Sequence, residues 1–177
     1  TTQMQDFGLE YNRLISLVPW QLALNLMGAA DNPCVLTGKV MDQENMTAVG
    51  KEIPFVQHIM NASRLCLAVY FDQYDIAWEM VKATKDLAKT NVGQSVVWRS
   101  SLFEGLTILS LARMTGDRIW KKRAKHVISR VEAWVSKGNL NCIHNLYLLR
   151  AELAVLEGQD ETSVRASYDK AISSAGR

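Results

Sequence analysis

Proline is scarce in this sequence and glycine is only moderately common: the 177 residues include three prolines and ten glycines. A β-sandwich or β-barrel needs a turn about every 8–12 residues, and Gly and Pro are the residues that usually supply it. The composition is also 48% hydrophobic, which is enough to form a core and argues against a disordered chain. We therefore expect few turns and long helices.

A large excess of one charge is also absent. Lys and Arg together number 20 and Asp and Glu number 18, for a formal net charge of +2. Domains that bind nucleic acid usually carry a clear basic excess, because most of their contacts are to phosphate. We therefore expect no nucleic-acid partner.

Long apolar runs and paired cysteines are missing too. The longest uncharged run, residues 14–30, is interrupted by polar residues and a proline, and it falls short of the roughly 20 mainly apolar residues that a spanning helix needs. We expect no membrane association. The three cysteines, Cys34, Cys66 and Cys142, show no C-x-x-C spacing. An odd number of unpaired thiols favours reduced, buried cysteines and a cytoplasmic location.

Nucleotide and metal motifs are incomplete. Thr37-Gly38-Lys39 resembles the end of a phosphate-binding loop, but the earlier glycine is missing and Val40 stands where Ser or Thr would bind magnesium. The three histidines, His58, His126 and His144, lie tens of residues apart with no ligand spacing. We expect no cofactor, no metal and no catalytic residue in this segment.

Apolar residues recur at three- and four-residue steps from about residue 53 onward. That spacing places them on one face of a helix rather than on one face of a strand. The stripe of the segment from 117 to 137 includes Trp120 and Trp134, which we expect to face the core. Helices are expected over 54–71, 75–90, 96–115, 117–137, 142–157 and a last segment from Val164 to Ala175.

Turn and helix-capping residues separate these segments at 72–75, 115–117 and 157–160. The three junctions lie about 42–44 residues apart, and each joins a more hydrophobic helix to a more charged one. A helical hairpin cannot bury its apolar face alone, so neighbouring hairpins stack. The pattern predicts an all-α fold, a right-handed α-α superhelix of tetratricopeptide-like hairpins, and favours it over a single helical bundle.

The first third of the chain has a different pattern. Residues 3–18 and 20–30 predict two helices, with Pro19 at the start of the second, where its missing N–H costs nothing. Residues 31–52 are polar and irregular, and so long a loop is functional, partly helical or mobile. We therefore divide the chain into 1–52, a helical pair with an irregular loop, and 53–177, about three hairpins.

The strongest charge feature lies in the predicted helix 117–137. Its simplest interpretation is a solvated face opposite the tryptophan stripe. The functional interpretation is a docking patch for an acidic partner segment or an anionic surface. Its candidate residues are Arg118, Lys121, Lys122 and Lys125.

Short segments in the first third and near the C-terminus form a pattern that is similar to a known family. They are Trp20-Gln21, Asn25-Leu26-Met27-Gly28, Pro33-x-x-Leu36-Thr37-Gly38-x-Val40-Met41, Leu148-Leu149-Arg150-Ala151-Glu152-Leu153-Ala154 and Tyr168-Asp169-Lys170-Ala171-Ile172. In this pattern the chain resembles the tetratricopeptide-like (MalT-like) helical-repeat region of large signalling proteins. Those proteins join a predicted ATPase to serine/threonine-kinase-like and hybrid histidine-kinase domains. The resemblance implies a coupling segment whose catalytic domains lie outside it.

Three functions follow from these patterns. The first is a non-catalytic scaffold that binds a protein or peptide, or neighbouring domains of the same chain, because stacked hairpins present an extended surface. Its candidate partner-binding residues are Arg64, Arg99, Glu104 and Arg150. The second is a helical enzyme whose site is assembled from residues distant in sequence. The third is a homodimer formed through an unpaired terminal repeat.

Overall fold

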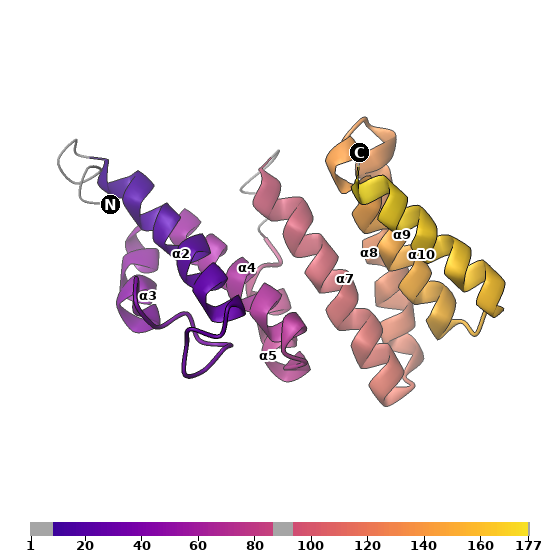
Figure 1. The fold of residues 1–177 in the computed structure, drawn as a ribbon, viewed down its shortest axis with the longest axis horizontal. Coiled ribbons are helices and arrows are strands. Elements are labelled where there is room, and N and C mark those ends of the chain that lie inside the picture. The colour runs from indigo at the N-terminus through magenta and orange to yellow at the C-terminus, as the bar shows by residue number, and fades with distance from the viewer. Residues whose placement is uncertain (1–8, 87–93, 177) are drawn as a thin grey trace. The chain divides into compact units, whose positions relative to one another are not determined.

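The structure, a computed structural model, describes residues 9–86 and 94–176. These residues form eight α-helices and one short 3-10 helix, with no strand among them (Figure 1). The predicted all-α class is confirmed. The chain divides into two compact units, residues 1–90 and 91–177, which we call the N-unit and the C-unit. Residues 52 and 53, between which the sequence analysis divides the chain, both lie in the N-unit.

The described helices of the N-unit are α2 (Glu10–Leu26), α3 (Gln43–Glu52), α4 (Pro54–Tyr70) and α5 (Tyr74–Ala83). Those of the C-unit are α7 (Ser95–Thr115), α8 (Arg118–Ser136), the 3-10 helix η1 (Leu140–Cys142), α9 (Ile143–Leu156) and α10 (Glu161–Ala175).

A single helix, α2, occupies the region where two helices were predicted. It continues through Pro19, so the prediction that this proline begins a second helix is wrong. Proline inside a helix removes one backbone hydrogen bond, but the side chains that α2 buries hold the segment helical. They are Leu17, Val18, Gln21 and Asn25. The part of the predicted helix at 3–8 lies outside the described residues.

The segment predicted as an irregular loop, 31–52, is half helical. Its second half is α3, which begins after Asp42, whose carboxylate accepts a hydrogen bond from the Asn45 N–H at 2.9 Å. Its first half is irregular but contributes Leu36 and Met41 to the core of the N-unit. These two apolar residues are too few to form a periodic pattern in the sequence, yet they attach the irregular segment to the core. The core also includes Leu17, Val18, Met46, Val56, Met60 and Leu67.

Helices α4 and α5 form the hairpin predicted around residues 72–75, and α4 packs against α2 and α3 as well. The turn places Asp72 at a φ of 55°, and the N–H of Gln73 donates to the carbonyl of Ala68 at 2.7 Å. The helix predicted to run to Thr90 ends at Ala83, and residues 87–90 lie outside the described ranges.

The two remaining predicted junctions are confirmed in the C-unit. Helix α7 ends at Thr115 and is followed by Gly116, whose φ of 67° is a left-handed conformation that glycine adopts without strain. Asp117 and Asp160 then cap α8 and α10, accepting backbone hydrogen bonds at 2.8 and 3.0 Å respectively. The described C-unit helices differ from their predicted limits by at most one residue, except that α10 begins three residues before Val164.

Packing in the C-unit follows the chain order. Helix α7 packs against α8, α9 against α10, and α7 also against α9 (Figure 1). The approach of α7 to α9 is close at Gly105, where an added Cβ would lie 2.5 Å from a methyl carbon of Leu149. Trp120 and Trp134 of α8 are only half-buried, so they do not face the core as fully as predicted. The buried stripe of α8 is Ala124, Val127, Ile128 and Val131.

Candidate functional site

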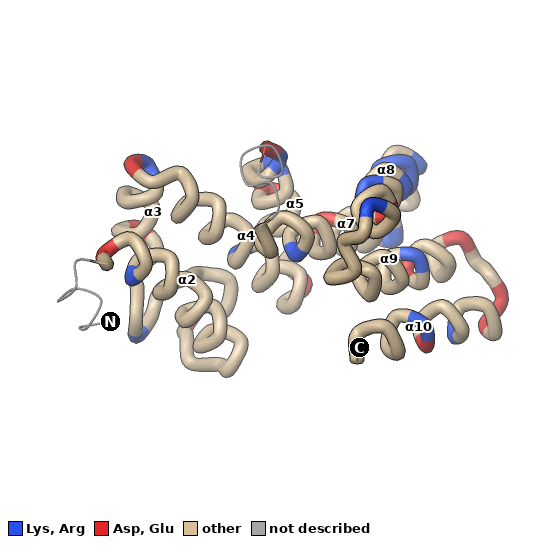
Figure 2. The backbone as a smooth tube through the Cα atoms, turned by 90° about the horizontal axis from the view of Figure 1, so that it is seen from above, with Lys and Arg blue, Asp and Glu red and all other residues tan. Residues whose placement is uncertain are grey.

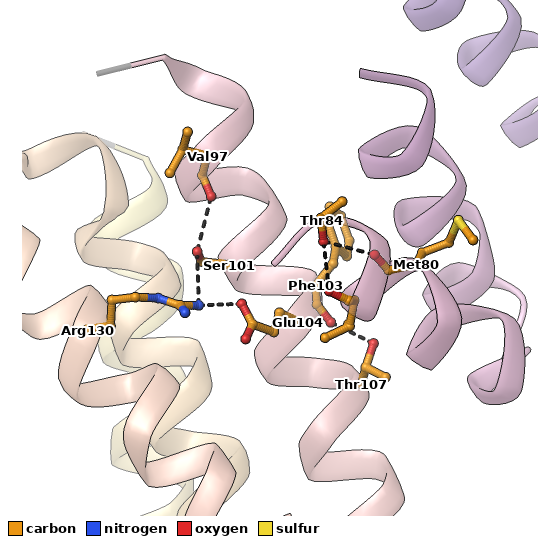
Figure 3. Close-up of polar contacts among 9 residues, drawn as sticks. Met80, Thr84, Val97, Ser101, Phe103, Glu104, Thr107 and Arg130 are labelled. Carbon is orange, nitrogen blue, oxygen red and sulfur yellow. Dashed lines mark hydrogen bonds and ion pairs between the residues drawn. The ribbon is translucent and has the colours of Figure 1, made fainter. Parts of the chain in front are cut away.

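Most charged side chains named by the sequence analysis lie in the C-unit, where several join one helix to the next. Arg130 of α8 forms an ion pair with Glu104 of α7 and donates to the hydroxyl of Ser101 at 3.3 Å (Figure 3). That hydroxyl donates in turn to the carbonyl of Val97 at 3.1 Å. Glu104, predicted to bind a partner, is therefore engaged in holding α7 to α8.

A second ion pair joins α9 to α8. Arg150 contacts Glu132, and both side chains are substantially exposed. An exposed pair of this kind contributes about 0–1 kcal/mol to stability, because both charges remain hydrated. Arg150, another predicted partner-binding residue, can therefore exchange Glu132 for an external carboxylate at little cost.

A third set of contacts spans three helices. Glu152 of α9 accepts from Arg113 of α7 on one carboxylate oxygen and from the hydroxyl of Tyr168 of α10, at 2.7 Å, on the other. Burial of the phenol, and then its bond to Glu152, raise the pKa of Tyr168 to about 12. The phenol is thus a neutral donor at physiological pH. These contacts fix α10 to the rest of the C-unit.

Glu157, at the C-terminal end of α9, contacts two lysines of α8. Its carboxylate lies 2.9 Å from the Lys125 ammonium and 3.4 Å from that of Lys121. The hydrogen bond from Lys125 is the main cause of the lowered pKa of Glu157, and Lys121 adds to it. Two of the four cations predicted as a basic patch are therefore paired within the molecule.

The other two cations of the predicted patch point to solvent. Arg118 and Lys122 are exposed, and neither has an ion pair among residues 9–86 and 94–176. Lys and Arg gather along α8 more densely than along the other C-unit helices (Figure 2). The guanidinium of Arg123 lies over the ring of Trp120, 5.2 Å from its centroid. The sequence-predicted patch thus exists as an exposed face, of which Glu157 neutralises one side.

Buried polar atoms without partners also occur in the C-unit. Asn145 is 1% exposed, and neither its amide nitrogen nor its amide oxygen has a hydrogen-bond partner within the described part of the chain. The hydroxyl of Ser100 and the Nε of Arg130 are also buried, and neither has a hydrogen-bond partner among the residues that the structure describes. Burying an amide without hydrogen bonds is costly, so Asn145 opposes the stability of its helix.

In the N-unit, two buried amides hold the irregular segment in place. Asn25 donates to the carbonyls of Pro33 and Val35, at 3.0 and 2.6 Å. Gln21 donates to Asn25 and accepts from the Val40 N–H at 3.2 Å. The sequence analysis did not predict this role, although Gln21 and Asn25 are both in the segments that resemble the known family. The feature that could have indicated it is that these two polar residues lie inside the long uncharged run 14–30.

The remaining two predicted partner-binding residues differ from each other. Arg64 of α4 is half-buried, and its Nε has no hydrogen-bond partner among the described atoms. Burial lowers the pKa of Arg64, an effect that the nearby Cys34 thiol partly opposes. Arg99 of α7 is exposed. Glu104 and Arg150 belong to contacts within the C-unit, so no single site within either unit contains all four residues.

The described residues contain neither a cluster of metal ligands nor a membrane-spanning helix. Within the described ranges, no group of three or more His, Cys, Asp or Glu side chains is placed to hold a metal ion. The three cysteines are free and buried, as predicted. No helix in the described portion is both long and apolar enough to cross a membrane.

No family model, curated protein sequence or solved structure matched this chain. The function must therefore be argued from the residues themselves.

Proposed function

We propose that this chain is a non-catalytic interaction scaffold of tetratricopeptide-like hairpins, stacked as a right-handed superhelix. The observation that carries the proposal is the packing of the C-unit. There α7 pairs with α8 and α9 with α10, while the first helices of the two hairpins, α7 and α9, contact each other. Hairpins joined in this way bury their apolar faces against neighbours and leave long helix surfaces free for a partner.

The partner in this proposal is a protein or peptide segment, or a neighbouring domain of the same longer chain. Exposed charged residues on the first helices of the C-unit hairpins, such as Arg99 and Arg150, suit an extended segment with carboxylates. The resemblance to the repeat region of ATPase and kinase signalling proteins suggests a coupling role in the cytoplasm. A homodimer through a terminal helix is the second arrangement that the same surfaces support.

The test is hydrogen exchange of the 177-residue chain in the presence of defined pools of extended 12-residue peptides. We expect at least one acidic pool to slow amide exchange in α7 and α9. An Arg99→Ala/Arg150→Ala variant should weaken this protection, and Arg165→Ala, an exposed arginine of α10, should leave it unchanged.

Two results would contradict the scaffold. One is unchanged exchange with every pool. The other is turnover of a chromogenic ester, phosphate or peptide substrate that a single substitution in the chain abolishes, which would favour the helical enzyme.

A further inference from the structure

The charge distribution along α8 is unusual for a helix. Residues 118–136 contain six Lys and Arg residues and one acidic residue, Glu132. No acidic residue lies in the first turn, where negative charge would favourably oppose the helix dipole. Cations at a helix N-terminus are instead unfavourable. The carboxylate of Asp117 caps this end of α8, but five Lys and Arg residues follow it within residues 118–125, more positive charge than one carboxylate balances.

Internal pairing accounts for only part of this charge. Lys121 and Lys125 contact Glu157, and Arg130 contacts Glu104. Arg118 and Lys122 are one helical turn apart, so they share a face, and both are exposed. That face is predominantly cationic in the described chain (Figure 2). Ile119, which lies three residues before Lys122 at the edge of that face, is 51% exposed.

We infer that this surface, the α8 basic face formed by Arg118, Lys121, Lys122 and Lys125, docks an acidic segment of a protein partner. The inference rests on the proposed scaffold function and names one partner class for it. Three or four cations on two to three turns of helix match a short run of carboxylates. Ile119 adds an apolar contact beside Arg118 and Lys122.

Two other anionic partners fit the surface less well. A membrane-surface helix inserts its apolar face into lipid, but the apolar face of α8 is buried within the C-unit, with Val127 2% and Val131 1% exposed. Single-stranded nucleic acid is bound by stacking on exposed aromatic rings. The aromatic residue nearest to these cations, Trp120, is half-buried and covered by Arg123.

Glu157 competes with the docked segment in this arrangement. Its carboxylate occupies Lys125 at 2.9 Å and Lys121 at 3.4 Å, which are the positions that an external carboxylate would take. A partner must therefore displace Glu157 or use Arg118 and Lys122 first. Removing the charge of Glu157 should strengthen binding of an acidic peptide, which a merely structural salt bridge would not do.

The experiment measures binding of a fluorescent octaglutamate peptide to the full 177-residue chain by anisotropy at low salt. Arg118→Gln/Lys122→Gln should weaken binding about fivefold, because each exposed charge contact contributes modestly. Lys51→Gln/Lys85→Gln, which removes two exposed cations of the N-unit, is the control matched for net charge and should leave binding unchanged.

Glu157→Gln should tighten binding of the same peptide about twofold or more. Asp169→Asn, an exposed acid of α10, is its control and should have little effect.

Equal weakening by the two double variants would overturn the inference, because only net charge would then matter. So would a Glu157→Gln variant that binds no more tightly than Asp169→Asn. Stronger α8-dependent binding to phosphatidylserine vesicles or to a 12-nucleotide single strand would also overturn it. If the α8 variants fail these tests while acidic peptide pools still protect α7 and α9 from exchange, the docking inference fails and the scaffold proposal stands.

Discussion

Several charged side chains of the C-unit join one helix to another. Glu152 shows this most clearly, since its two oxygens accept from Arg113 of α7 and from Tyr168 of α10. Glu157 joins α9 to α8 through Lys121 and Lys125 in the same way. Because each such residue is tied to a different element, its partner could not be read from sequence spacing.

Asn145 is the clear exception, because its buried amide has no partner within the described ranges. Replacing it with the similarly sized leucine removes the desolvation cost of that amide. We expect Asn145→Leu to raise the free energy of unfolding by about 1–3 kcal/mol, measured by urea denaturation.

Asn12→Leu, at an exposed position of α2, is the control and should change stability by less than about 0.5 kcal/mol. A lower stability for Asn145→Leu would show instead that the amide has a partner, such as a buried water.

Helix α2 shows how burial overrides a local signal. Pro19 usually marks a helix start, yet here it lies inside a 17-residue helix. The helix persists because one of its sides is anchored both by apolar packing and by the amides of Gln21 and Asn25. Proline still removes one backbone bond and strains the turn before it.

Pro19→Ala should therefore stabilise the N-unit, by about 2 kcal/mol, since proline inside a helix costs about 3 kcal/mol relative to alanine. Thermal unfolding followed by circular dichroism would measure it. Pro54→Ala is the matched control: Pro54 lies at the first position of α4, where no hydrogen bond is lost, so little change is expected. An equal gain in stability in both variants would show that the stabilisation does not come from restoring the backbone inside α2.

The whole chain is organised as two compact units. The core of the N-unit includes Leu36 and Met41 from the irregular segment together with α2, α3 and α4. The C-unit buries its own stripe on α8 and Leu146 and Leu149 of α9. Each unit therefore has apolar contacts that do not depend on distant parts of the chain.

We expect residues 91–177, expressed alone, to remain helical and to unfold in one cooperative urea transition followed by the fluorescence of Trp98, Trp120 and Trp134. The reason is that the ion pairs and hydrogen bonds of α7 to α10 described above stay within this segment. A gradual transition, with strong binding of a hydrophobic dye, would show that the C-unit needs the rest of the chain.

Most helices of the C-unit could be predicted closely because their signals are local. A three- and four-residue apolar period, a glycine such as Gly116 and a capping Asp such as Asp117 all lie within a few residues of the boundary that they set. The N-unit was predicted less well. Pro19 indicated a helix start, but the burial of neighbouring side chains keeps α2 continuous through it. Leu36 is a core residue, but no periodic apolar pattern around it predicted that position.

The candidate site was predicted in part. The basic residues of α8 lie within a few residues of one another in the sequence, so the helical period alone predicted that Arg118, Lys122 and Lys125 share one face. The partners Glu157 and Glu104 were not predictable from local spacing, because they lie far along the chain from the residues they contact; Glu104 is 26 residues from Arg130.

The sequence by itself therefore determined the helical class, the C-unit helices and the basic face, since each depends on neighbouring residues along the chain. Only the tertiary structure decided which charges are free. Glu104 was a candidate for partner binding until folding placed it against Arg130. Lys121 and Lys125 were candidates for docking until folding placed them against Glu157. Helix packing sets the distances between side chains that are far apart in sequence, and those distances decide whether a charge is paired inside the molecule or remains available to a partner.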